Sequence, residues 1–236
     1  MKTRIFKYSL LAGAMVFSGL AAANPSAVLA VKGQVSTGTC TAVLPTDNID
    51  LGTISADSLP TTGSLNALPS GKKYYLQITC TSPLKYEVSL TDNRADSVIP
   101  ATETAGGASY EGRLLGLGKT SDGVNIGGYF IIIQNVTATI NGTDYQDVLV
   151  RTSESGSAWE KIPEGGGLIM TPLNNAAGVG NRAYVAMAAV GSLEPEASAT
   201  AEFRFETVAA YISSALRSIT DQQTIDGNVT FNVDYL

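Results

Sequence analysis

The chain has 236 residues, no histidine, two cysteines, and 15 basic against 21 acidic residues, so its formal net charge is −6. The absence of histidine excludes Ser-His-Asp and Cys-His catalysis and most zinc sites. Carboxylate and lysine chemistry stay open, but we expect no enzymatic activity, no metal and no cofactor. The acidic balance opposes binding to nucleic acid and to anionic lipid.

Residues 1–23 are predicted to be a secretory signal peptide. Lys2, Arg4 and Lys7 precede an apolar run, and the alanines at 21–23 form a small-residue cleavage site before Asn24. Removal of the signal peptide takes away three basic and no acidic residues, so the formal net charge of the mature chain is about −9. No later stretch reaches the roughly 18 apolar residues of a membrane helix. We therefore expect an exported mature chain, in the periplasm or at the cell surface, that does not insert into the membrane.

The two cysteines are Cys40 and Cys80. In an oxidising compartment, two cysteines most simply form one disulfide. This bond would close a loop of about 40 residues, which the chain-entropy account values at roughly 3–4 kcal/mol. The alternative is two free thiols or a pair of metal ligands.

Turn residues recur about every ten positions in a sequence rich in Thr, Val, Ser and Gly, which is typical of an all-β protein. Asn141-Gly142 favours the type I′ turn of a hairpin between two of the predicted strands. Residues 206–219 fit a strand to about Tyr211, followed by a turn or one short helix. The predicted strands before this segment are residues 27–35, 73–80, 85–92, 128–140, 143–150, 181–190 and 198–208.

The segment 227–236 has the clearest strand pattern in the chain. Apolar and aromatic residues alternate strictly with polar ones, which marks a strand with one buried face. The predicted buried face consists of Val229, Phe231, Val233 and Tyr235. No linker divides residues 24–236, so we expect a single β-sandwich with long loops.

Two motifs resemble sites of enzymes. Residues 112–120 resemble a phosphate-binding loop, but the first glycine is one position out of place, and we interpret the segment as a loop or turn. Ser70 with Lys73, and Ser82 with Lys85, match the Ser-x-x-Lys pattern of exported serine enzymes. That chemistry needs a helix, whereas both pairs lie in strand-like sequence, so we treat them as chance matches.

The remaining polar motifs have structural interpretations. Three glycosylation triplets are expected in a Thr-rich β-protein, and we predict no dependence on glycans. Two acidic pairs lack calcium-loop spacing and are predicted to be solvated. The lone Trp159 fits the packing of a loop onto the sandwich better than the binding of a sugar ring. The triplets begin at Asn135, Asn141 and Asn228, and the pairs are Asp92 with Asp96 and Asp144 with Asp147.

Several segments together resemble pilins of the chaperone–usher pathway. Residues 31–40, VKGQVSTGTC, are similar to the first pilin strand with its cysteine, and residues 74–80, YYLQITC, to the second. Residues 184–205 are similar to the late pilin hairpin, and Tyr235 to the penultimate aromatic residue. The segments LTDNR, LGLGKTSDGVNIGG and DGNVTFNVDYL also resemble a set of exported proteins described as beta-fimbriae subunits of unknown function.

The pilin resemblance implies an immunoglobulin-like sandwich that lacks its last strand. A periplasmic chaperone would fill the resulting groove first, and the N-terminal arm of a neighbouring subunit would fill it later, with an usher as a further partner. Ala27, Leu29, Val31 and Val35 would be the buried face of that arm. The function implied is a fimbrial subunit or a fimbria-like surface protein.

Two departures from pilins leave an alternative open. The arm before Lys32 is short, and the closing strand follows a late hairpin that is already complete near Tyr211. The closing strand is therefore either the final strand beside an open groove, or an extra strand that fills the groove. The second arrangement would make a self-complemented monomeric binding or scaffold module.

Overall fold

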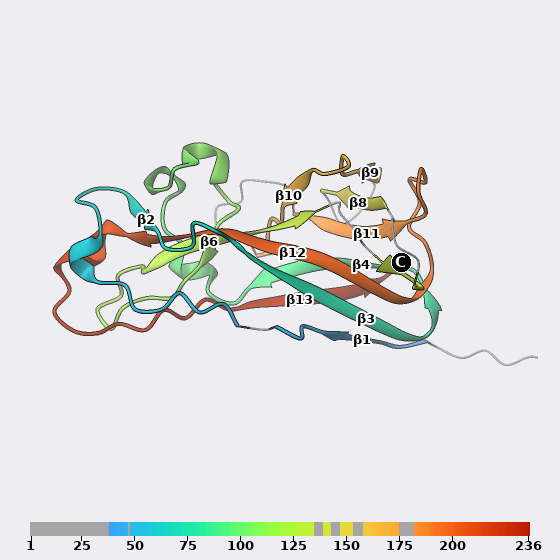
Figure 1. Ribbon diagram of the computed structural model, residues 1–236, viewed down its shortest axis with the longest axis horizontal. Coiled ribbons are helices and arrows are strands. Elements are labelled where there is room, and N and C mark those ends of the chain that lie inside the picture. Colours follow the sequence, from blue (N-terminus) through green and yellow to red (C-terminus); the bar gives the residue numbers. More distant parts are fainter. Residues whose placement is uncertain (1–37, 47, 135–138, 143–146, 153–157, 175–181) are drawn as a thin grey trace, which may run out of the picture. The chain divides into compact units, whose positions relative to one another are not determined.

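The computed structural model describes residues 38–236, except 47, 135–138, 143–146, 153–157 and 175–181. These residues form two antiparallel β-sheets around a shared core, with short 3-10 helices and no α-helix among them (Figure 1). The prediction of an all-β sandwich is confirmed. The predicted signal peptide and the predicted strand 27–35 lie outside the described residues.

The first sheet has the strand order β1-β3-β12-β6-β10. The short strands β2 and β7 also pair with β12, and β5 pairs with β6. The bounds are β1 Cys40–Val43, β2 Ser64–Asn66, β3 Lys72–Leu84, β5 Leu115–Gly116, β6 Gly127–Gln134, β7 Thr139–Ile140, β10 Gly167–Ile169 and β12 Ser198–Ser213.

The second sheet has the strand order β13-β4-β11-β8-β9. Its strands are β4 Tyr86–Asp92, β8 Asp147–Arg151, β9 Glu160–Lys161, β11 Tyr184–Ala188 and β13 Val229–Tyr235. The closing strand predicted from the alternation is therefore confirmed as β13. It pairs with β4 along its whole length and lies at the edge of the sheet.

The core lies between the sheets, and the period-two pattern of the strands fills it. In β3, the residues Tyr74, Leu76 and Ile78 are buried and alternate with exposed ones. In β12, Phe203 and Phe205 are completely buried. Strand β4 contributes buried apolar side chains from the second sheet to the same cluster. Alternation therefore identifies the inward face of these strands correctly, as expected for a sheet covered on that side.

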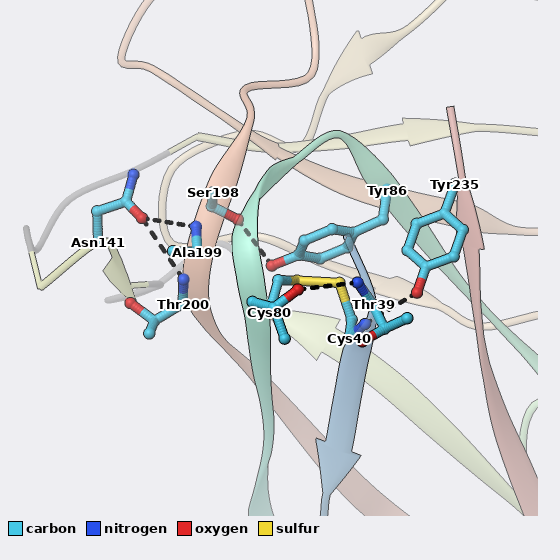
Figure 2. Close-up of a disulfide and its surroundings, with 10 residues drawn as sticks. Thr39, Cys40, Cys80, Tyr86, Asn141, Ser198, Ala199, Thr200 and Tyr235 are labelled. Atoms are coloured by element: carbon cyan, nitrogen blue, oxygen red, sulfur yellow. Dashed lines mark hydrogen bonds between the residues drawn. A yellow bond between two sulfur atoms is a disulfide. The ribbon is translucent and has the colours of Figure 1, made fainter. Parts of the chain in front are cut away.

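The hairpin predicted at Asn141-Gly142 is wrong, although the turn is present. Both residues have positive φ, 49° and 76°, as a type I′ turn requires. However, β7 before the turn pairs with β12, whereas β8 after it pairs with β11 and β9 in the other sheet. Asn141 Oδ1 accepts hydrogen bonds from the N–H groups of Ala199 and Thr200, at 2.9 and 3.5 Å (Figure 2). These bonds tie the turn to the start of β12.

The late hairpin implied by the pilin resemblance is also absent. Strands β11 and β12 belong to different sheets, so the chain between them crosses the sandwich. The predicted strands at 73–80 and 85–92 are present as β3 and β4, and they too lie in different sheets. Strand β12 ends at Ser213 and a 3-10 helix follows at Ser214–Ser218, as predicted for this segment.

Two carboxylates predicted to be solvated are instead buried. Asp92 is 1% exposed and accepts hydrogen bonds from the backbone N–H groups of Arg94 and Gly116, both at 2.8 Å. Asp147 is also buried and pairs with Lys161 Nζ at 2.7 Å. The backbone N–H groups of Gly116 and Gly191, from segments distant in the sequence, donate to Asp92 and Asp147 respectively.

Among the other polar motifs, the prediction of a solvated side chain is correct for Asp96. Asp96 has an exposed side chain, paired with Lys119 at 2.9 Å. Asn228 is exposed and accepts a hydrogen bond from the Asn93 side chain. Asn135 and Asp144 lie outside the described residues.

Candidate functional site

Two strands form neighbouring edges of the sandwich. Strand β1 ends the first sheet and pairs with β3, and strand β13 ends the second sheet and pairs with β4. Neither strand has a second partner strand among the described residues. An unpaired edge presents backbone N–H and C=O groups to any extended segment that can reach them.

A groove of about 340 Å³ lies between the segment that follows β1 and the start of β13. One wall consists mainly of Leu44, Ile49 and Leu51. The other consists mainly of Ile225, Val229 and Phe231. The floor comes from the inner strands of the first sheet and from the loop before β6, through Tyr74, Leu117, Tyr129, Ile131, Thr207 and Ala210. Thr46, Asn48, Asp226 and Asn228 also line the groove, so the site is a trough of mixed apolar and polar character.

Strand β13 forms a wall of this groove and does not fill it. Val229, Phe231 and Val233 are half-buried and pack against the core, so the predicted inward face is correct for these three residues. The Phe231 ring lies 4.8 Å from the ring of Phe205 and 6.4 Å from that of Tyr74. The groove lies beside Val229 and Phe231, so the burial of these two side chains is incomplete.

Tyr235 was predicted to be buried, but it is 55% exposed. It lies at the end of the strand, where its Oη accepts a hydrogen bond from the backbone N–H of Cys40 at 2.9 Å (Figure 2). This bond joins the edge strand of one sheet to the edge strand of the other. Tyr235 therefore contributes a hydrogen bond at the disulfide end of the molecule and little buried surface.

The predicted disulfide between Cys40 and Cys80 is present. The two residues are directly opposite each other in the β1–β3 register. The backbone of Thr39 and the side chain of Thr81 add a hydrogen bond of 3.1 Å beside it. The disulfide fixes β1 to β3 at the point where Tyr235 contacts Cys40, so this end of the two edges is held in place (Figure 2). A disulfide is consistent with an exported protein.

Three hydroxyl groups belong to the floor of the groove. Tyr74 and Thr207 are almost fully buried, and neither Tyr74 Oη nor Thr207 Oγ1 has a hydrogen-bond partner of normal geometry among the described residues. Burial raises the pKa of the Tyr74 phenol, and the neighbouring Thr207 hydroxyl offsets part of that rise. Burial also raises the pKa of Tyr129, and the charge of Asp92 adds to the effect.

Only part of the predicted strand-addition site can be placed. The structure brings Val229 and Phe231 to the groove, while Val233 and Tyr235 lie farther along β13 towards the disulfide. Ala27, Leu29, Val31 and Val35 lie outside the described residues. The wall formed by Leu44, Ile49 and Leu51 and the polar floor were not predicted from the sequence. The signal in the sequence that could have indicated the polar floor is the presence of hydroxyl side chains, Tyr74 and Thr207, at inward strand positions.

The enzyme-like motifs lack the structure that their chemistry needs. Ser70 lies in a turn and Lys73 in β3, while Ser82 lies in β3 and Lys85 directly follows it. Neither pair lies on a helix. Residues 112–120 contain β5 and turns, and no helix follows them. The described part of the chain holds no group of three or more acidic or cysteine side chains that could bind a metal ion. It also holds no helix long and apolar enough to cross a membrane.

Trp159 is half-buried, and the Arg151 guanidinium lies 5.3 Å from its ring. Arg151 also lies 4.7 Å from the Tyr184 ring and forms a buried ion pair with Glu87. These contacts tie Trp159 to the second sheet, which is consistent with the packing role predicted for it.

Comparison with known proteins gives distant relatives. The pattern of a family described as "Protein of unknown function (DUF1120)" matches residues 29–130. Protein GltF of Escherichia coli (strain K12) is 27% identical over 239 residues, which covers 93% of this chain and 92% of that protein. The uncharacterized protein YhcF of the same strain is 29% identical over 149 residues, 57% of this chain and 61% of that protein.

Proposed function

We propose that this chain is a structural subunit of a fimbria, or a fimbria-like surface protein, that assembles by strand addition in the groove beside β13. The observation that carries the proposal is the groove itself, with apolar residues in both walls and the unpaired edge of β13 beside it. A strand placed there would bond to the edge of β13 and would direct alternate side chains into the trough.

The order of elements supports the same function. A disulfide joins the first strand to the strand that follows it in the sheet, and the last strand of the chain lies at the edge of the opposite sheet. The resemblance to chaperone–usher pilins implies the same disulfide and closing strand, although the late hairpin that it also implies is absent. In the proposed assembly, a periplasmic chaperone would occupy the groove before an usher brings subunits together.

We propose the segment that contains Ala27, Leu29 and Val31 as the strand donated to a neighbouring subunit. Strand β13 has seven residues, which span about 23 Å at roughly 3.3 Å per residue. The eight residues from 24 to 31 are long enough to pair along it. A groove along the whole sandwich would require a longer arm, but eight residues are enough for β13.

The alternative is a monomeric module whose own last strand seals the groove. In the structure, β13 pairs with β4 and borders the groove, and Val229 and Phe231 line it. This position favours a groove that receives a strand from elsewhere.

Electrophoresis of unboiled samples tests the proposed function. Subunits joined by strand addition should give a ladder of bands when the protein is produced with its chaperone and usher. Leu29→Glu places a charge on the inward face of the donated strand and should abolish the ladder. Ala30→Glu, on the opposite face, is the matched control and should keep it. A single monomeric band from the wild-type protein under these conditions contradicts the proposal.

A further inference from the structure

We infer that Lys32 of the donated arm lies beside Asp226 of the neighbouring copy, and that this ion pair sets the register of the arm along β13. The inference rests on the proposed function, in which the occupant of the groove is the N-terminal segment of a second copy of this chain. It adds the residue on each copy that aligns the two strands.

The arm and the groove have complementary charges. Asp226 is the one charged residue among the described residues that line the groove. Lys32 is the one charged residue between positions 24 and 37. Opposite charges on two surfaces that meet favour one alignment over the others, and so fix the register of a complex. Asp47 lies outside the described residues and is therefore compared by experiment below.

Asp226 has an acceptor atom for a second cation. Its Oδ2 accepts hydrogen bonds from Arg94 Nη2 and from Arg94 Nε, the latter at 3.0 Å, whereas no described residue donates to Oδ1. The side chain is 54% exposed, so a lysine of another chain can reach it. The surrounding groups leave the site acidic by one formal charge, because two cations lie among three carboxylates. These groups are Arg94 and Lys119, with Asp92, Asp96 and Asp226.

The length of the arm leads to the same pair. In an antiparallel arrangement, the eight residues 24–31 match the eight residues from Val229 to the end of the chain when Val31 lies opposite Val229. Val229 packs against the core, so both valines then face inward. Lys32 lies on the outward side, diagonal to Asp226, at a separation that a long side chain can span.

The ion pair distinguishes registers that the apolar pattern does not. A shift by two residues keeps the same face of the arm inward. A shift towards the disulfide end moves Lys32 about 7 Å farther from Asp226, at roughly 3.3 Å per residue. A shift the other way places Val31 beside Gly227, which precedes β13 and has no side chain to pack against it. The register with Val31 opposite Val229 avoids both losses.

The positions of the groove and of the first strand agree with this direction. Tyr235 contacts Cys40, so β1 begins beside the end of β13 (Figure 2). The groove lies at the start of β13. An arm with residue 31 at that start connects to a donor placed beyond it, and the disulfide end of the acceptor stays free. The opposite direction would bring two disulfide ends together and would stop assembly at two copies.

The test measures how tightly ten-residue peptides bind the mature protein, refolded in the presence of each peptide, by fluorescence anisotropy. The parent peptide has the sequence of residues 24–33, with the label on a flexible C-terminal linker. We expect it to bind about two- to five-fold more tightly than its Lys32→Gln variant at low ionic strength, as for an exposed ion pair. The two should bind equally at about 1 M salt, where the Debye length is about 3 Å.

Protein variants locate the partner of Lys32. Asp226→Asn should remove the preference for the parent peptide, and Asp226→Lys should make a Lys32→Glu peptide the tighter binder. Asp221→Asn is the matched control, because Asp221 is an exposed carboxylate of the same segment that does not line the groove, and it should keep the preference. A preference that survives Asp226→Asn, or that is lost only in Asp47→Asn, overturns the inference.

The remaining outcomes test the direction and separate the inference from the function on which it rests. A peptide that combines Lys32→Gln with Ser26→Lys carries its charge at the other end, and it should bind no better than Lys32→Gln alone. Tighter binding that depends on Asp226 would establish the opposite direction and overturn the inference. Equal binding of the parent and Lys32→Gln peptides at low salt also overturns it, but leaves strand addition intact. Absence of binding by every peptide contradicts strand addition itself.

Discussion

The hydroxyl of Tyr235 accepts a hydrogen bond from the backbone N–H of Cys40, with 2.9 Å between the two atoms (Figure 2). The bond links the last strand of the second sheet to the first strand of the first sheet. It also occupies a backbone donor on the free side of β1, since the other side of β1 faces β3. A strand that pairs with β1 at this point must therefore displace Tyr235.

Tyr235→Phe should consequently have two opposite effects. Loss of the hydrogen bond should lower the free energy of unfolding by about 0.5–1.5 kcal/mol, and less if water replaces the phenol. Affinity for a donor peptide that reaches β1 should rise, because the Cys40 N–H is then available. Urea unfolding and peptide titration measure the two effects, with the exposed Tyr75→Phe as control. A variant that loses both stability and peptide affinity would show that Tyr235 supports the groove and does not compete for it.

The disulfide should be a major contribution to stability. Replacement of Cys40 and Cys80 together by alanine opens a loop of about 40 residues in the denatured chain and should cost roughly 3–4 kcal/mol. The measurement is the shift of the urea midpoint, with a non-reduced digest and mass spectrometry to establish the bond in periplasmic material. Two free thiols in periplasmic material, or an unchanged urea midpoint, would contradict a stabilising disulfide.

The hydroxyls of two buried tyrosines should behave differently. Tyr86→Phe breaks the bond to Ser198 and should destabilise the protein by about 1 kcal/mol. Tyr74→Phe removes a hydroxyl whose contact with the Thr207 side chain lacks normal hydrogen-bond geometry, so it should cost less stability than Tyr86→Phe. Both are measured by urea unfolding with a donor strand bound, because the protein alone is expected to be unstable. A loss at Tyr74 as large as that at Tyr86 would mean that the Tyr74 hydroxyl is fully hydrogen-bonded.

In this chain, the local residue pattern predicts where strands lie better than it predicts which strands pair with each other. The alternation in β3, β4 and β13 gives the inward faces correctly, except at the exposed Tyr235, because a sheet that is covered on one side imposes period two. Asn141 and Gly142 adopt the predicted backbone, but a turn fixes only local geometry. The partner of β7 depends on the long strand β12, to which Asn141 is bonded across 58 positions. A local turn signal contains no information about such a contact.

The candidate site was predictable only where its residues lie in regular strands. Val229 and Phe231 were identified from alternation, whereas the wall at 44–51 has no strand pattern and depends on its position after β1. Asp92 and Asp147 were wrongly predicted to be solvated, because their partners are backbone N–H groups and a lysine from distant segments. Composition does not reveal partners of this kind.

The buried Asp147 should contribute to stability in a way that depends on pH. Burial acts to raise the pKa of Asp147, but hydrogen bonds from Lys161 and from the Gly191 N–H lower it below the ordinary value of 3.8. A carboxylate with a lowered pKa stabilises the fold above its unfolded pKa, and this contribution is lost as the pH falls through the folded value.

Asp147→Asn should therefore be less stable than the wild-type protein at pH 6, by about 1 kcal/mol given that Lys161 is partly exposed. The difference should disappear as the pH falls from about 4 to below the folded pKa. Urea unfolding across this range measures it. Asp96→Asn, which removes an exposed carboxylate, is the control and should show little difference at any pH. A difference at Asp147 that stays constant down to pH 2 would exclude a charge effect.

Equilibrium urea unfolding of the mature protein, with and without a donor strand, tests the open groove most directly. The donor is a peptide with the sequence of residues 24–31, and its control carries proline at inward positions, which removes backbone donors. We expect an unstable or aggregating protein without the donor, and an increase of about 2.7 kcal/mol when the donor is present at 100 times its Kd. A cooperative transition with several kcal/mol of stability in the protein alone, unchanged by the donor, would contradict strand addition and establish a self-complemented monomer.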